Sequence, residues 1–155
     1  MMLEIKSPLL RLACVVGALV TLTLPGCSSG EREYMTVPLA KVSGKVLDNG
    51  EPVVRAKVAF HPVLPSTDPP LIPSAMTDEQ GQFQLTTYLQ ADGAPPGEYR
   101  VTISCPVLPN PKAAGIQLPV DKYKGRFSNP EKSKWTVTVN EGENSIDPFD
   151  VSSGK

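Results

Sequence analysis

The chain has 155 residues, enough for one domain, and 17 of them are proline. Its 15 basic and 16 acidic side chains leave a net charge of −1, which excludes the basic field that nucleic-acid binding requires. Interior prolines remove a backbone donor and clash with the preceding helical turn. The proline content therefore argues against a helical bundle or a doubly wound fold, and no nucleic-acid partner is expected.

The first 26 residues have the features of an export signal. Two basic residues precede an uncharged segment, residues 12–24, which is too short for a membrane span of about 20 residues but suits a signal-peptide core. Leu24-Pro25-Gly26-Cys27 then resembles a bacterial lipobox. The resemblance implies cleavage after Gly26 and acylation of Cys27, with palmitate among the acyl chains. The alternative is a plain secretory signal whose Cys27 is incidental.

The lipobox resemblance also implies a location. The mature protein is expected in the bacterial cell envelope, lipid-anchored through Cys27 to a membrane on the exported side. Cys14 leaves with the signal and Cys27 is modified, so Cys105 is the one free thiol expected and no internal disulfide can form. Residues 27–36 are expected to form a polar tether, and residues 152–155 a short C-terminal tail.

Between residues 37 and 151 the apolar residues recur with a period of two. Seven short segments, most of them alternating, are predicted as strands at residues 41–46, 55–60, 74–77, 82–87, 98–105, 134–139 and 144–151. Because such alternation buries one face of a sheet, two sheets must face each other, which predicts an all-β sandwich. The last segment changes parity before Phe149, indicating a bulge or edge at Pro148. Trp135 shares the parity of Val137, which predicts core packing; an exposed binding platform is the alternative.

Four motifs in this region occur in a recognisable order. They are Val42-x-Gly44-x-Val46; Asp48-x-Gly50-x-Pro52-Val53-x-x-Ala56-x-Val58-x-Phe60; Thr77-Asp78-x-x-Gly81-x-Phe83-x-Leu85; and Gly97-Glu98-Tyr99-x-Val101-Thr102-Ile103. Together they resemble the carboxypeptidase regulatory-like domain, here following a lipobox as in small bacterial lipoproteins. The resemblance implies a transthyretin-like, seven-stranded Greek-key β-sandwich with an accessory or interaction role.

Two proline-rich segments are expected to be loops. Residues 61–73 contain five prolines and are predicted to shield a sheet edge, or to offer a docking surface. Residues 106–133 exceed the length of about 12–15 residues above which loops are usually functional or disordered. Leu118, Tyr123 and Phe127 are expected to tie this loop down.

The second loop is the candidate partner-binding site. Basic side chains gather in it, at Lys112, Lys122, Lys124, Arg126, Lys132 and Lys134. The predicted binding residues are Leu118, Lys122, Tyr123, Lys124, Arg126 and Phe127. The expected partner is an envelope protein or a polysaccharide, with anionic polysaccharide or lipid headgroups matching the basic charge. The alternative is a solvated loop face.

The sequence indicates no catalytic machinery. His61 is the single histidine and stands without a partner motif, while Cys105 lies on the apolar parity of a strand. Cys and His show no metal-ligand spacing, and one turn around Asp78 offers fewer oxygens than the roughly 6–8 that calcium takes. We expect a non-catalytic protein, without metal or cofactor, that serves protein or polysaccharide interaction or envelope structure. The alternative is a hydrolase-like enzyme that relies on His61, or on a carboxylate pair such as Asp121 with a neighbour.

Overall fold

The computed structural model describes residues 36–110, 112 and 115–152; the signal peptide, Cys27 and residues 153–155 lie outside them. The described residues form an all-β fold, as predicted, with one short 3₁₀ helix, η2 (Pro130–Lys132). The strands are β1 (Lys41–Asp48), β2 (Glu51–Pro52), β3 (Lys57–Pro62), β4 (Ser74–Met76), β5 (Gln82–Gln84), β6 (Gly97–Ser104), β7 (Pro106–Val107), β8 (Val120–Asp121), β9 (Thr136–Val139), β10 (Glu143–Ser145) and β11 (Phe149–Asp150). Within this part of the chain, no helix has the length and apolarity to cross a membrane.

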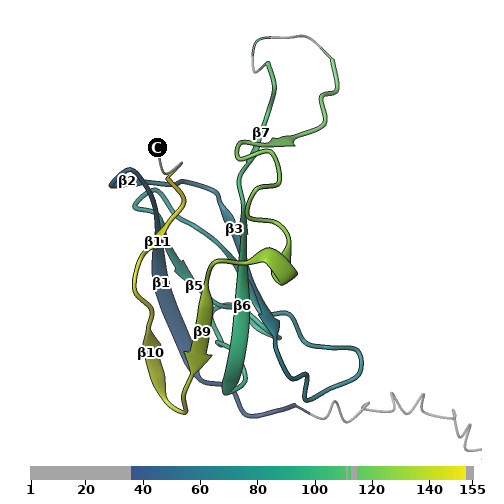
Figure 1. The fold of residues 1–155 in the computed structure, drawn as a ribbon, viewed down its shortest axis with the longest axis vertical. Helices are drawn as coiled ribbons and strands as arrows, with labels where there is room; N and C mark the ends of the chain where they lie inside the picture. The colour runs from purple at the N-terminus through teal and green to yellow at the C-terminus, as the bar shows by residue number, and fades with distance from the viewer. Residues whose placement is uncertain (1–35, 111, 113–114, 153–155) are drawn as a thin grey trace, which may run out of the picture. The chain divides into compact units, whose positions relative to one another are not determined.

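Two sheets face each other across the core (Figure 1). In the first sheet, β1 pairs antiparallel with β2 and β5 on one side and parallel with β10 and β11 on the other. The second sheet is antiparallel throughout, in the order β4-β3-β6-β9. A two-residue ladder joins β7 to β8. Each of the seven predicted segments contains a strand, the last one containing two.

The predicted inward positions form the core. Alternate residues of β1, β3 and β6 are almost fully buried, namely Val42, Val46, Val58, Phe60, Tyr99, Val101 and Ile103. Aromatic rings fill the space between the sheets, and Phe60 lies 5.7 Å from Tyr99 and 6.4 Å from both Phe83 and Phe149 between ring centroids. The inward position 44 is a glycine because a Cβ there would lie 2.6 Å from Phe83 Cζ.

Two turns explain the polar residues of the motifs without a ligand. Asn49 and Gly50 form a two-residue hairpin loop between β1 and β2, with positive φ of 54° and 85°, as a type I′ turn requires. Asp78 Oδ1 accepts hydrogen bonds from the N–H groups of Gln80 and Gln82 at 2.9 and 2.8 Å. The turn before β5 therefore uses this carboxylate to satisfy its own backbone.

The structure refines the predicted ends of the strands. The final strand is interrupted at residues 146–148, between β10 and β11, where the parity change indicated a bulge or edge. The prediction that residues 61–73 form a loop was wrong at its start, because His61 and Pro62 still pair with Arg100 and Tyr99 as the last residues of β3. The remaining residues connect β3 to the edge strand β4. Their role as an edge shield or a docking surface stays a prediction.

Candidate interaction site

The long loop after β6 consists of two parts, which we name the arm and the root. The arm is residues 106–120, which extends from the end of the sandwich (Figure 1); residues 111, 113 and 114 within it lie outside the described residues. The root is residues 121–135, which returns along the sandwich through η2 to β9. The β7–β8 ladder separates the two parts by pairing Val107 with Val120.

Asp121 organises the start of the root. Its Oδ1 accepts hydrogen bonds from the N–H groups of Cys105 at 2.8 Å and Tyr123 at 3.3 Å, and its Oδ2 accepts one from Gly125 N–H at 2.8 Å. One carboxylate thus joins the end of β6 to the turn that follows β8. Asp121 is the carboxylate named in the enzyme alternative. Its three hydrogen bonds give it a structural role here.

Asp48 fastens the root to the β1–β2 turn. Its Oδ2 accepts hydrogen bonds from Lys122 Nζ and from Tyr123 Oη, both at 3.1 Å. Burial, followed by the bond to Asp48, raises the pKa of Tyr123 to about 12. The same carboxylate raises the pKa of Lys122 above its usual value. Tyr123 is therefore neutral and Lys122 charged at neutral pH, which keeps both bonds intact.

Phe127 is the apolar fastening of the root. Its side chain is only 8% exposed and packs edge-on against Tyr123, with the ring centroids 5.6 Å apart. Ile103 N–H donates a hydrogen bond to the Phe127 carbonyl at 3.0 Å, which fixes the root to β6. The structure thus agrees with the prediction that Tyr123 and Phe127 tie the loop down. The same prediction for Leu118 was wrong: it is 81% exposed, because it lies on the arm beyond the β7–β8 ladder.

The surface of the arm is apolar. It exposes five large aliphatic side chains, at Val107, Leu108, Ile116, Leu118 and Val120. The sequence of residues 106–120 contains no acidic residue and one basic residue, Lys112. Apolar side chains that gather on an exposed segment mark interaction surfaces. Of the predicted binding residues, Leu118 therefore presents itself for direct contact, whereas Phe127 is covered by the sandwich.

The basic residues of the loop do not form one patch. Lys122 is paired with Asp48, Lys124 is exposed in the turn after it, and Lys112 lies on the arm. The other three line a hollow of about 280 Å³ on the root, together with Phe127, Ser133, Trp135 and Ser152; they are Arg126, Lys132 and Lys134. We call this the basic hollow. An adjoining hollow of about 400 Å³ shares Lys134 and Trp135 with it.

Trp135 is half-buried at the rim of the core. Its ring centroid lies 5.4 Å from that of Phe149 and 5.3 Å from that of Phe127, so it packs against the core as its parity predicted. The remaining part of the ring lines both hollows, and Lys134 Nζ lies 4.6 Å from the ring centroid. Trp135 therefore contributes to the core and to a surface.

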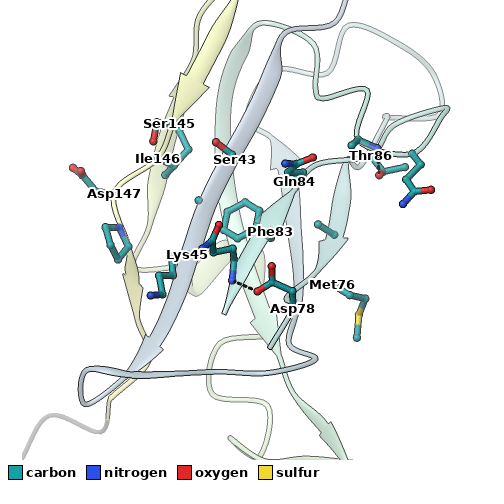
Figure 2. Close-up of a pocket in the computed structure, with 16 residues that line it drawn as sticks. Ser43, Lys45, Met76, Asp78, Phe83, Gln84, Thr86, Ser145, Ile146 and Asp147 are labelled. Carbon is teal, nitrogen blue, oxygen red and sulfur yellow. Dashed lines mark hydrogen bonds between the residues drawn. The ribbon is translucent and has the colours of Figure 1, made fainter. Parts of the chain in front are cut away.

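A third surface is an open concavity of about 750 Å³ over β1, β5 and β10 (Figure 2). Strand register places Gln84, Ser43 and Ser145 in one row, with Gln82 and Lys45 in the next. Its carboxamide and hydroxyl groups both donate and accept hydrogen bonds, and Lys45, Asp78 and Asp147 also line the concavity. The sequence analysis missed this surface, although its residues are the outward half of the alternation that predicted the strands.

The two candidate nucleophile or base residues occupy ordinary structural positions. His61 Nε2 lies 2.9 Å from Thr102 Oγ1 on the outer face of the second sheet. Burial, followed by the charge of Lys57, lowers the His61 pKa. Burial likewise raises the pKa of the Cys105 thiol, which favours the unreactive protonated form. Among the described residues, no three His, Cys, Asp or Glu side chains gather as metal ligands.

Comparison with known proteins reveals no matching family and no matching curated protein. Among solved structures, the chain is similar to a 9R-lipoxygenase from Cyanothece PCC8801, with 13% identity and a TM-score of 0.40, over 74% of this chain and 16% of that one. A candidate carbohydrate-binding protein, PA1324 from Pseudomonas aeruginosa, gives 15% identity and a TM-score of 0.39, over 74% and 89% of the two chains. A DUF3823 family protein from Parabacteroides merdae gives 16% and 0.35, over 72% and 45%. Similarities this low assign no function.

Proposed function

We propose that the chain is a lipid-anchored lipoprotein of the bacterial cell envelope, whose non-catalytic β-sandwich presents the arm to an envelope protein. The observation that carries this proposal is the surface of the arm. It exposes five large aliphatic side chains and has no acidic residue, while the root holds it to the sandwich. Aliphatic surface of this kind gains free energy by contact with apolar surface of a protein, which favours a protein partner over a polysaccharide.

The start of β1 and the fastening of the root lie at opposite ends of that strand. The described chain enters β1 at Lys41, and β1 ends at Asp48, where the root is fastened (Figure 1). The strand separates these two residues by about 23 Å, at roughly 3.3 Å per residue.

The proposal includes the finer assignment of the sandwich to the carboxypeptidase regulatory-like, transthyretin-like domain. Three of the four motifs that support it have a physical purpose in this fold. Gly44 makes room for Phe83, Asn49 and Gly50 make the type I′ turn, and Asp78 closes the turn before β5. These residues serve the scaffold, which agrees with a domain that carries partners without chemistry of its own.

The test is capture of a partner from solubilised membranes by the full, tagged chain. Replacing Ile116 and Leu118 by serine is expected to abolish capture, because both side chains are exposed on the arm. The matched control replaces Leu64 and Leu89, which are 87% and 73% exposed elsewhere on the sandwich, and should leave capture unchanged. Equal capture by both variants would refute the arm as the docking site.

The anchor has a separate test. The proposal predicts that mass spectrometry of membrane-extracted protein shows a mature chain that begins at acylated Cys27. Replacing Cys27 by alanine should release the chain from the membrane fraction. A chain that begins at another residue, or a C27A variant that stays in the membrane, contradicts the lipoprotein proposal.

A further inference from the structure

We propose that the basic hollow on the root binds an acidic saccharide, with Arg126, Lys132 and Lys134 holding its carboxylate, sulfate or phosphate group. This site is distinct from the arm, and it does not depend on a protein partner for the arm. Three of the six basic residues of the loop converge there, from positions separated by the η2 turn. This convergence of three basic side chains on one hollow is the observation that supports an anionic ligand.

The three cations are available to an anionic ligand. The residues lining the hollow include none that is acidic, and within the described part of the chain the ion pair is Lys122 with Asp48. Lys134 Nζ donates to the Asp150 backbone carbonyl at 2.6 Å. The pKa of the Asp150 carboxyl is lowered first by the hydrogen bond from Ser152 N–H at 2.8 Å and also by the charge of Lys134, so this carboxylate offsets part of the Lys134 charge. The other acidic neighbour is Glu131 within η2. Three positive charges therefore line the hollow, and the two carboxylates lie outside its lining.

Aromatic rings hold two of these cations over the hollow. Lys134 Nζ lies 4.6 Å from the Trp135 ring centroid and 5.1 Å from that of Phe127, while Arg126 Cζ lies 5.5 Å from the Phe127 centroid. Cation–π contacts of this kind restrict flexible side chains before a ligand arrives. The protein thus reduces the entropy that binding an anion would otherwise cost.

The walls of the hollow favour a sugar as the carrier of the anion. Trp135 offers an aromatic ring on which the C–H face of a sugar ring can pack, and Ser133 and Ser152 also line the hollow. A volume of about 280 Å³ lies at the lower end of small-molecule sites, which suits one sugar ring. The adjoining hollow shares Lys134 and Trp135, so a longer chain has room to continue.

The experiment uses the purified full chain in detergent. Trp135 is the single tryptophan, so its fluorescence reports binding at this place. The probes are polygalacturonate, dextran sulfate, neutral dextran, and phosphatidylglycerol mixed into the detergent micelles. We expect at least one acidic polysaccharide to change the fluorescence, with an affinity that falls as salt is added. Neutral dextran and the added phosphatidylglycerol should produce no change.

Two double variants locate the site. Replacing Arg126 and Lys132 by glutamine removes two charge-assisted contacts and should weaken binding about tenfold or more. Lys112 and Lys124 provide the matched control, because their replacement removes the same charge from the same loop outside the hollow and should change affinity less than about twofold. The I116S/L118S arm variant should bind the polysaccharide normally, even if it has lost a protein partner.

Several results would overturn the inference. Equal loss of affinity in the Arg126/Lys132 and Lys112/Lys124 variants would indicate diffuse attraction by the loop. A fluorescence change with phosphatidylglycerol alone would indicate that the hollow binds a lipid headgroup. Binding that leaves Trp135 fluorescence unchanged would exclude the basic hollow. Binding that is lost when Gln82 and Gln84 are replaced by alanine would place the saccharide on the concavity of Figure 2 instead.

Discussion

The root and the arm belong to one loop, but apolar side chains are buried in the root and exposed in the arm. In the root, Phe127 is covered by the sandwich and Tyr123 is half-buried against it. In the arm, Ile116 is 100% exposed. The difference follows from hydrogen bonds: Asp121, Asp48 and the backbone of Ile103 return the root to the sandwich. The arm is instead closed by the two-residue ladder and by hydrogen bonds between Asn110 and Gln117, both within the arm. An apolar residue in a loop therefore indicates scaffold or interaction surface according to what returns its backbone to the fold.

The largest expected effect is the difference in stability between truncating a buried side chain of the root and truncating an exposed one of the arm. Phe127→Ala should lower the free energy of unfolding by about 3–5 kcal/mol, because it removes a buried ring and leaves a cavity. Ile116→Ala should change it by less than about 0.5 kcal/mol, since that side chain is already in water. Urea unfolding of both variants measures the difference, and similar losses would show that the arm is part of the core.

The second prediction removes hydrogen bonds that hold the root to the sandwich and leaves the apolar side chains unchanged. Asp121→Ala leaves three N–H groups without their acceptor and should cost about 1–3 kcal/mol, while protease cleavage within the loop becomes faster. Asp147 is the control, because it is also an aspartate and is exposed at the interruption between β10 and β11. Asp147→Ala should change stability by less than about 0.5 kcal/mol. If D121A and D147A unfold alike, Asp121 does not organise the root.

The scaffold could be predicted from the sequence because its signals are local. The alternation around Val42, Val58 and Val101 sets which residues face the core, and Asn49-Gly50 specifies its own turn. The division of the loop could not be predicted in this way. Leu118, Tyr123 and Phe127 look alike as apolar residues in a basic segment, and their burial depends on hydrogen bonds to distant residues such as Asp48.

The basic hollow was beyond prediction for the same reason. Arg126, Lys132 and Lys134 share no periodicity, and they converge because η2 turns the chain between them, with Asn129 capping its start by accepting the Glu131 N–H at 2.8 Å. Parity identified Trp135 as a core residue, which is half of its role. Alternation along a strand predicts which face of the sheet a residue lies on. It does not predict whether a residue at the edge of that face is covered.

The third prediction uses pH to loosen the root while the arm is unchanged. The folded-state pKa of Tyr123 is raised from 10 to about 12, so its contribution to stability is fully present below pH 10 and is lost as the pH rises through about 12. Between these values the wild-type chain should lose more stability than Tyr123→Phe, which has no proton to release. Denaturant unfolding across this range, with Tyr88→Phe as an exposed control, measures the effect. Identical pH dependence in Y123F and the wild type would exclude it.

The smallest expected effect concerns the ion pair between the root and the β1–β2 turn. Lys122 and Asp48 lie 3.1 Å apart, but their side chains are 49% and 22% exposed, so water and salt weaken their attraction. A double-mutant cycle with Lys122→Met and Asp48→Asn should give a coupling of about 0.2–1 kcal/mol that decreases as salt is added. A salt-independent coupling well above this range would mean that the ion pair, rather than Phe127, holds the root. The root would then be held chiefly by a pair that salt does not weaken, and Phe127→Ala would cost less stability than expected above.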